Sequence, residues 1–170
     1  MADPTVHLAQ VNVARLRAPL DSAELADFVA ALAPVNALAD AAHGFVWRLQ
    51  DEGGDATGVP VLGDPALIVN LSVWESLDVL RAFVYNGRHL DVMRRRRDWF
   101  ARITEAYQAL WWVPAGHRPT VAEAEERLLM LRERGSTPRA FTFARPFGPD
   151  GMDWSPPEQE TRLGYVPGRA

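Results

Sequence analysis

Hydrophobic and polar positions alternate with a period of two in four parts of the chain, which predicts four β-strands. The strands are expected at residues 6–16, 44–50, 66–74 and 108–114. Two shorter runs, at residues 56–62 and 140–143, predict lesser strands. The first of these would lie at a sheet edge, because Pro60 has no N–H to donate to a neighbouring strand.

A hydrophobic period of 3.6 residues predicts helices between these strands. One helix is expected from Ser22 to Ala41, with a kink at Pro34, and another begins after Ser76. A third has the capping pair Thr120 and Glu123 and ends at Gly135. The apolar stripe of the first helix contains Leu25, Phe28, Val29 and Leu32.

The order of these elements predicts one α+β domain over residues 1–145, an antiparallel sheet with helices on one face. After Arg145 proline and glycine become frequent, and residues 146–170 are expected to form a disordered tail. Removal of the chain after Arg145 should then leave the domain folded.

Each predicted strand has one apolar face and one mixed face. In residues 66–74 the apolar face contains Leu67, Val69, Leu71 and Val73, and the mixed face contains Ile68, Asn70, Ser72 and Trp74. The mixed face could meet solvent, as in many antiparallel sheets. Ile68 and Trp74 are poor surface residues, however. We therefore expect helices on one face and the sheet of a second copy on the other, which makes the protein a homodimer.

Two cationic residues share an apolar stripe in the arginine-rich segment. A helix begun at His89 places Met93, Arg96, Phe100, Ile103 and Tyr107 within about 40° of it, while Arg94 and Arg95 point away. His89 and Arg96 are then either a helix end with a snorkelling arginine or a pair that faces a cavity. Asn36, near the stripe of the first helix, is either bonded at the Pro34 kink or part of the same cavity.

Composition excludes several kinds of chemistry. The 170 residues include no cysteine, so thiolate ligands and cysteine nucleophiles are absent, and all 18 basic residues are arginine, which excludes a Schiff-base lysine. The four histidines show no metal-ligand spacing. A net charge of −4 argues against nucleic-acid binding. With no signal-like start and no long apolar run, we expect a cytoplasmic protein without membrane contact.

The stretches "LAQVNVARL", "GFVWRLQDEGGDAT", "VNLSVWES", "WWVPAGHRPT" and "AFTF" together resemble the bacterial domain-of-unknown-function family 3291. The resemblance covers roughly residues 6–143. This family is similar to the antibiotic biosynthesis monooxygenases of the dimeric α/β-barrel superfamily. The resemblance implies ferredoxin-like monomers that pair sheet to sheet, each with a cleft between its sheet and its two main helices.

The haem-degrading members of that superfamily provide a site pattern to compare. Asn12 matches their first-strand asparagine, and Val73–Ser76 match their V-W-x-S lead-in to a helix. Their tryptophan is replaced here by Phe83, and His89 comes about one helical turn earlier than their histidine. If haem binds, the resemblance makes His89 its axial ligand.

From this resemblance we expect a monooxygenase-like or cofactor-independent enzyme of secondary metabolism that acts on a small hydrophobic or aromatic molecule. His89 would transfer a proton, and Arg96 or Arg48 would stabilise negative charge. Substrate-binding residues would be Asn12, Asn36, Asn70, Trp74, Phe83 and Trp112. Two alternatives stay open: a haem-binding member of the superfamily, and a non-enzymatic dimer that binds small molecules or acts as a scaffold. No cofactor is certain, and no metal site is expected.

Overall fold

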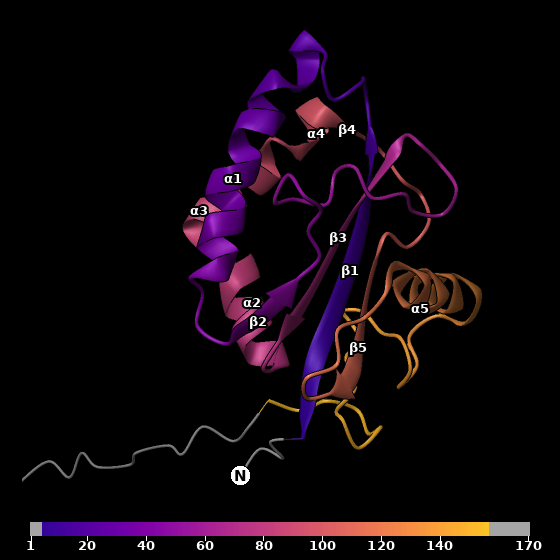
Figure 1. Cartoon of the computed structure of the whole chain (residues 1–170). Helices are drawn as coiled ribbons and strands as arrows, with labels where there is room; N and C mark the ends of the chain where they lie inside the picture. The colour runs from indigo at the N-terminus through magenta and orange to yellow at the C-terminus, as the bar shows by residue number, and fades with distance from the viewer. Residues whose placement is uncertain (1–4, 157–170) are drawn as a thin grey trace, which may run out of the picture.

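The computed structural model describes residues 5–156, and a five-stranded antiparallel sheet lies at its centre (Figure 1). The strands are β1 (Val6–Leu16), β2 (Phe45–Arg48), β3 (Leu67–Trp74), β4 (Phe100–Ala101) and β5 (Gln108–Pro114). They follow the order β2-β3-β1-β5, and the short β4 pairs with the far end of β1 on the same edge as β5. This arrangement is the predicted ferredoxin-like α+β fold.

Four helices lie on one side of the sheet: α1 (Ala26–Asp40), α2 (Leu77–Val84), α3 (Gly87–Arg94) and α4 (Arg96–Trp99) (Figure 1). Their buried residues form two clusters. Leu77 and Leu80 pack with Trp74 of the sheet, and Phe28 packs with Trp99 at the other end. The even-numbered residues of β1 and β3 face this helical layer.

Helix α5 (Val121–Arg134) lies on the opposite side of the sheet, beside β5 (Figure 1). With Ala56 and Val61 of the loop after β2, it covers the apolar face of the sheet. Val11 and Leu71 of that face are each 1% exposed. The premise of the predicted homodimer, an apolar face left bare in one chain, is therefore wrong, because the chain covers this face itself.

Two predicted elements differ from the structure because pairing across the chain overrides the local pattern. Residues 56–62 form turns and no strand, and they pack on the sheet instead. The helix expected to run from His89 to Tyr107 is interrupted after Arg94, where α3 ends, and the short α4 that follows ends at Trp99. Phe100 is extended there because it pairs with Leu16 of β1. The expected strand at residues 140–143 is reduced to isolated bridges, such as Leu110 with Phe141.

The segment of residues 146–156 packs on the domain. Phe147 is 8% exposed and contacts the buried cluster of Phe141 and Leu110. The indole Nε1 of Trp112 donates a hydrogen bond to the Phe147 carbonyl at 2.8 Å. The boundary predicted after Arg145 is therefore wrong for residues 146–156. The rest of the predicted tail, residues 157–170, lies outside the described residues. Within residues 5–156, no helix has the length and apolar character that a membrane crossing needs.

Candidate functional site

A cleft lies between the helix-facing side of the sheet and the helices α1 and α3. It consists of two adjoining cavities of about 150 Å³ each. One, the His89 cavity, is lined by His89, Trp74 and Phe83. The other, the Arg96 cavity, is lined by Arg96, Phe100 and Tyr107. Both cavities are lined by Asn12, Asn36, Arg48, Asn70 and Met93, so the two form one continuous site.

The floor of the cleft is made by residue pairs across β1 and β3. Gln10 lies opposite Ser72, and Asn12 lies opposite Asn70. The Trp74 indole Nε1 donates to the Ser72 hydroxyl at 2.9 Å, and that hydroxyl donates to Gln10 Oε1 at 2.9 Å. These two hydrogen bonds hold the Gln10 side chain so that its oxygen accepts from Ser72. The amide nitrogen of Gln10 can then donate to a bound molecule.

Four further carboxamides line the cleft, and their side chains form no hydrogen bonds among the described residues: Asn12, Asn36, Asn70 and Gln108. Asn36 therefore does not bond at the Pro34 kink, which was one of its two expected roles. Each carboxamide offers both donors and an acceptor. Between the aliphatic and aromatic walls, such groups can orient a mostly apolar ligand.

His89 lines this cleft, and its Nε2 has no hydrogen-bond partner among residues 5–156. Its Nδ1 lies 3.0 Å from the Val84 carbonyl oxygen. A carbonyl only accepts, so Nδ1 carries the hydrogen, and Nε2 is left with a lone pair in the neutral ring. Burial lowers the pKa of His89 below its ordinary value, although the bond to Val84 acts in the opposite direction. The ring is thus neutral at neutral pH and able to accept a proton.

An aromatic wall leads from His89 into the core. The centroid of the Phe83 ring lies 5.0 Å from that of His89 and 4.9 Å from that of Trp74. Phe45 meets Trp74 edge to face at 5.4 Å. A flat apolar ligand would stack on or against these rings, and offset or edge contacts of this kind are favourable.

The two predicted arginines differ in their charge balance. Arg48 pairs with Asp40, with Nε to Oδ1 at 2.7 Å, and also donates to the Gly54 carbonyl. Arg96 has no carboxylate partner in the described part of the chain, and its guanidinium lies over the Tyr107 ring at 4.9 Å. Arg96 is therefore the cation available to a ligand. Arg48 serves to hold the loop after β2 against α1.

Arg94 and Arg95 point away from the cleft, as the helical projection predicts. Arg94 pairs with Asp91 at 3.2 Å, and Arg95 pairs with Asp27 at 2.8 Å, all of them exposed. Met93, Arg96, Phe100 and Tyr107 meet at the Arg96 cavity although they belong to no continuous helix. The projection thus predicted the right neighbours from a helix that ends early.

Eight of the nine predicted site residues line the cleft. Trp112 does not, because it lies on the edge strand β5, where Phe147 and the segment after Arg145 cover it. Sequence reasoning overlooked Gln10, Ser72, Gln108 and Tyr107 as site residues. Gln10 and Ser72 could have been found, since each lies two residues from a predicted asparagine on the same strand face.

The cleft does not fit a haem. His89 offers one axial nitrogen, but the two cavities of about 150 Å³ each together reach only the lower end of the roughly 300–1,000 Å³ of ordinary ligand pockets, and a porphyrin is a large ligand. Among residues 5–156, no three His, Asp or Glu side chains gather where a metal ion could bind.

Comparisons with known proteins place the chain in a family. The model of the family "Domain of unknown function (DUF3291)" matches residues 7–156. A search of curated proteins finds no match. Among solved structures, SnoaB, a cofactor-independent oxygenase from Streptomyces nogalater, is 16% identical with a TM-score of 0.42 and covers 66% of this chain and 95% of its own.

Two further structures are similar at the same level. A candidate antibiotic biosynthesis monooxygenase from Chloroflexus aurantiacus is 16% identical, with a TM-score of 0.40, and covers 68% of this chain and 98% of its own. A protein from Pseudomonas aeruginosa is 13% identical, with a TM-score of 0.44, and covers 70% of this chain and all 100% of its own.

Proposed function

This chain belongs to the DUF3291 family, and from the geometry of its cleft we propose that it is a monooxygenase-like or cofactor-independent enzyme. Its substrate is a small hydrophobic or aromatic molecule with an acidic O–H or C–H group. One observation carries the proposal. His89 is a neutral ring with a free Nε2, held by Val84 at the end of an aromatic wall.

The first step is removal of a proton from the bound substrate. His89 Nε2 accepts it, and the Val84 carbonyl oxygen keeps its hydrogen bond to Nδ1 as the ring becomes cationic. A histidine whose pKa lies near or below the working pH is largely in its base form, which general-base catalysis needs. Phe83 and Trp74 hold the substrate ring beside it.

The second step is stabilisation of the anion that remains. Asn12 and Asn70 are neighbours across the β1–β3 pair, and their amide groups can donate to an enolate or phenolate oxygen. Arg96 supplies a positive charge from the other cavity. A deprotonated aromatic of this kind is electron-rich and can reduce dioxygen directly, which is how an oxygenation proceeds without a cofactor.

The test is turnover of a panel of hydroxylated aromatic compounds, followed by dioxygen consumption and by incorporation of isotopically labelled oxygen. We expect His89→Gln to reduce turnover by about 100-fold or more while ligand binding persists. His43→Gln is the matched control, because His43 is exposed and outside the cleft. Equal turnover in His89→Gln and the unaltered protein would overturn the role of His89. Binding of such compounds without turnover would favour the non-enzymatic binding protein.

The homodimer expected from the family resemblance belongs to the same proposal. It would have to use a surface other than the apolar face, because Val11 and Leu71 are already covered by α5 and the loop after β2. Light scattering at micromolar concentration should give twice the 18.9 kDa mass of the chain. A mass of one chain would refute the dimer and leave the cleft unaffected, since residues of one chain line it.

A further inference from the structure

An open basin of about 940 Å³ adjoins the Arg96 cavity. The two share Arg96, Phe100 and Tyr107, so the basin forms an outer chamber of the cleft. Four arginines line the basin: Arg17, Arg96, Arg97 and Arg102. No acidic residue is among the side chains that line it.

Pairing of β4 with the end of β1 brings these arginines together. Leu16 pairs with Phe100, and the Arg17 backbone N–H donates to the Trp99 carbonyl at 3.0 Å. The Arg17 side chain then reaches the Arg97 carbonyl, with Nη1 to O at 2.7 Å. This corner is therefore built by contacts between segments 80 residues apart, which a flexible surface run of arginines would not make.

Within residues 5–156, the four guanidinium groups form no ion pair with an acidic side chain. Of the twelve described arginines outside the basin, seven pair with a carboxylate, among them Arg15 with Asp64 and Arg132 with Glu105. In the described part of the chain, none of the four basin arginines forms such a pair. The chain has 22 acidic residues against 18 basic ones, so a shortage of acids does not explain this. Like charges around a hollow repel one another, and an anion would relieve that repulsion.

We propose that the basin binds the phosphate or diphosphate group of an organic ligand whose apolar part occupies the cleft. The planar guanidinium fork matches the oxygens of such anions with two parallel hydrogen bonds. A phosphate ester carries nearly two negative charges and three acceptor oxygens, which suits several arginines better than a single carboxylate does. The phosphate site is inferred from the basin alone, whereas binding of the apolar part of the ligand in the cleft rests on the proposed function.

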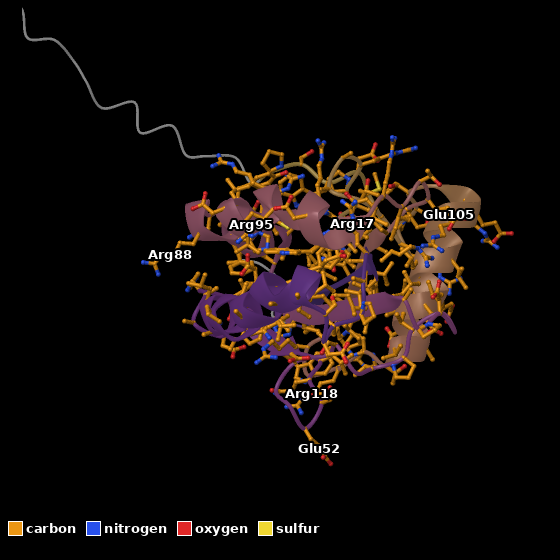
Figure 2. All side chains as sticks on the ribbon, turned by 90° about the horizontal axis from the view of Figure 1, so that it is seen from above. Arg17, Glu52, Arg88, Arg95, Glu105 and Arg118 are labelled. Atoms are coloured by element: carbon orange, nitrogen blue, oxygen red, sulfur yellow. The ribbon has the colours of Figure 1, made fainter. Side chains whose placement is uncertain are left out.

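Titration calorimetry with inorganic pyrophosphate at low ionic strength tests the basin. We expect the double variant Arg97→Gln/Arg102→Gln to bind pyrophosphate at least about tenfold more weakly, the scale of one charged hydrogen bond. The matched control is Arg88→Gln/Arg118→Gln, which removes the same charge. Arg88 and Arg118 are exposed, lie outside the basin and stand well apart from Arg17 in Figure 2. The control should bind as tightly as the unaltered protein.

The outcomes separate the explanations. Equal weakening in both double variants, or no pyrophosphate binding at all, would overturn the basin as a site. Acetate that binds as tightly as pyrophosphate would overturn the phosphate assignment. Binding to the unaltered protein should also fall at least about tenfold between roughly 10 mM and 0.5 M salt, because exposed guanidinium groups are screened. Salt-insensitive binding would contradict the proposal even if the double variant failed to fold.

Fluorescence titration with neutral 2-naphthol reports separately on the cleft. Both double variants should bind it like the unaltered protein, because Arg97 and Arg102 do not line either cavity. If neither the unaltered protein nor the variants bind naphthol while pyrophosphate still binds, the apolar cleft of the proposed function is refuted. The phosphate site would be unaffected by that result. The reverse pattern would refute the phosphate site alone.

Discussion

Replacement of Phe147 by alanine should destabilise the whole domain, although Phe147 lies beyond the last predicted element. Its ring is 8% exposed and meets Phe141 at a centroid distance of 6.1 Å. Leu8, Leu110 and Trp74 belong to the same buried cluster. That cluster also supports the floor of the cleft, because Trp74 anchors the hydrogen-bond chain to Gln10.

The expected loss in unfolding free energy is about 3 kcal/mol. Phenylalanine-to-alanine changes in cores cost about 3–5 kcal/mol, and the lower end applies because this site lies at the sheet edge and can partly refill. The Trp112 hydrogen bond goes to the main-chain carbonyl and survives the substitution. Truncation after Arg145 removes both the ring and that carbonyl. It should cost about 1 kcal/mol more.

Urea unfolding followed by tryptophan fluorescence measures these differences. A loss of about 3 kcal/mol corresponds to a fall in melting temperature of roughly 6–12 °C. Truncation after residue 156 is the control, and it should match the full chain because every contact of Phe147 described above is retained. If truncation after Arg145 left stability within about 0.5 kcal/mol of the full chain, the packing of residues 146–156 would be refuted.

Two further predictions concern the helical side of the sheet. Gly44→Ala should cost more than about 1 kcal/mol in thermal unfolding, since Gly44 has φ +73° and an added Cβ would lie 2.6 Å from Val79 Cγ1; a neutral result would show that α2 can shift. The lowered pKa of His89 predicts that stability is retained above about pH 6.5 and is lost as the pH falls through the folded-state pKa, because the unfolded chain binds the proton more readily. His89→Gln, compared with His43→Gln, should flatten that part of the pH profile of melting temperature, and unchanged curvature would contradict it.

The local pattern of the sequence was sufficient for the central strands, whereas the cleft between the sheet and the helices was expected from the family resemblance. Strand β1 spans Val6–Leu16 and β5 spans Gln108–Pro114, as their alternation predicts. Asn12 and Asn70 were predicted to share a site because both lie on the mixed face of their strands, and Asn12 also matches the first-strand asparagine of the resemblance. Alternation fixes which face a side chain occupies, and so it also fixes which residues can line a cleft on that face.

Packing between distant segments was beyond the same pattern. The capping pair Thr120 and Glu123 was predicted, and Thr120 does accept a hydrogen bond from the Glu123 backbone. The Glu123 carboxylate, however, accepts hydrogen bonds from Trp111 and His117. These bonds help to place α5 on the apolar face of the sheet, whereas the prediction had helices on one face only and a second copy on the other. No periodicity reveals which of several apolar surfaces a helix will cover.

The two faces of the sheet explain together how the cleft can keep its carboxamides unpaired. Val13 lies opposite Val69 and Val11 opposite Leu71 on the buried face, and between them Asn12 lies opposite Asn70 on the other. A slip of one residue would move all the valines into the cleft and the asparagines into the core, at a prohibitive cost. The apolar face therefore fixes the register without help from the cleft. The asparagines are consequently held in place by packing on the opposite face of the sheet, and their hydrogen-bonding groups are left for a ligand.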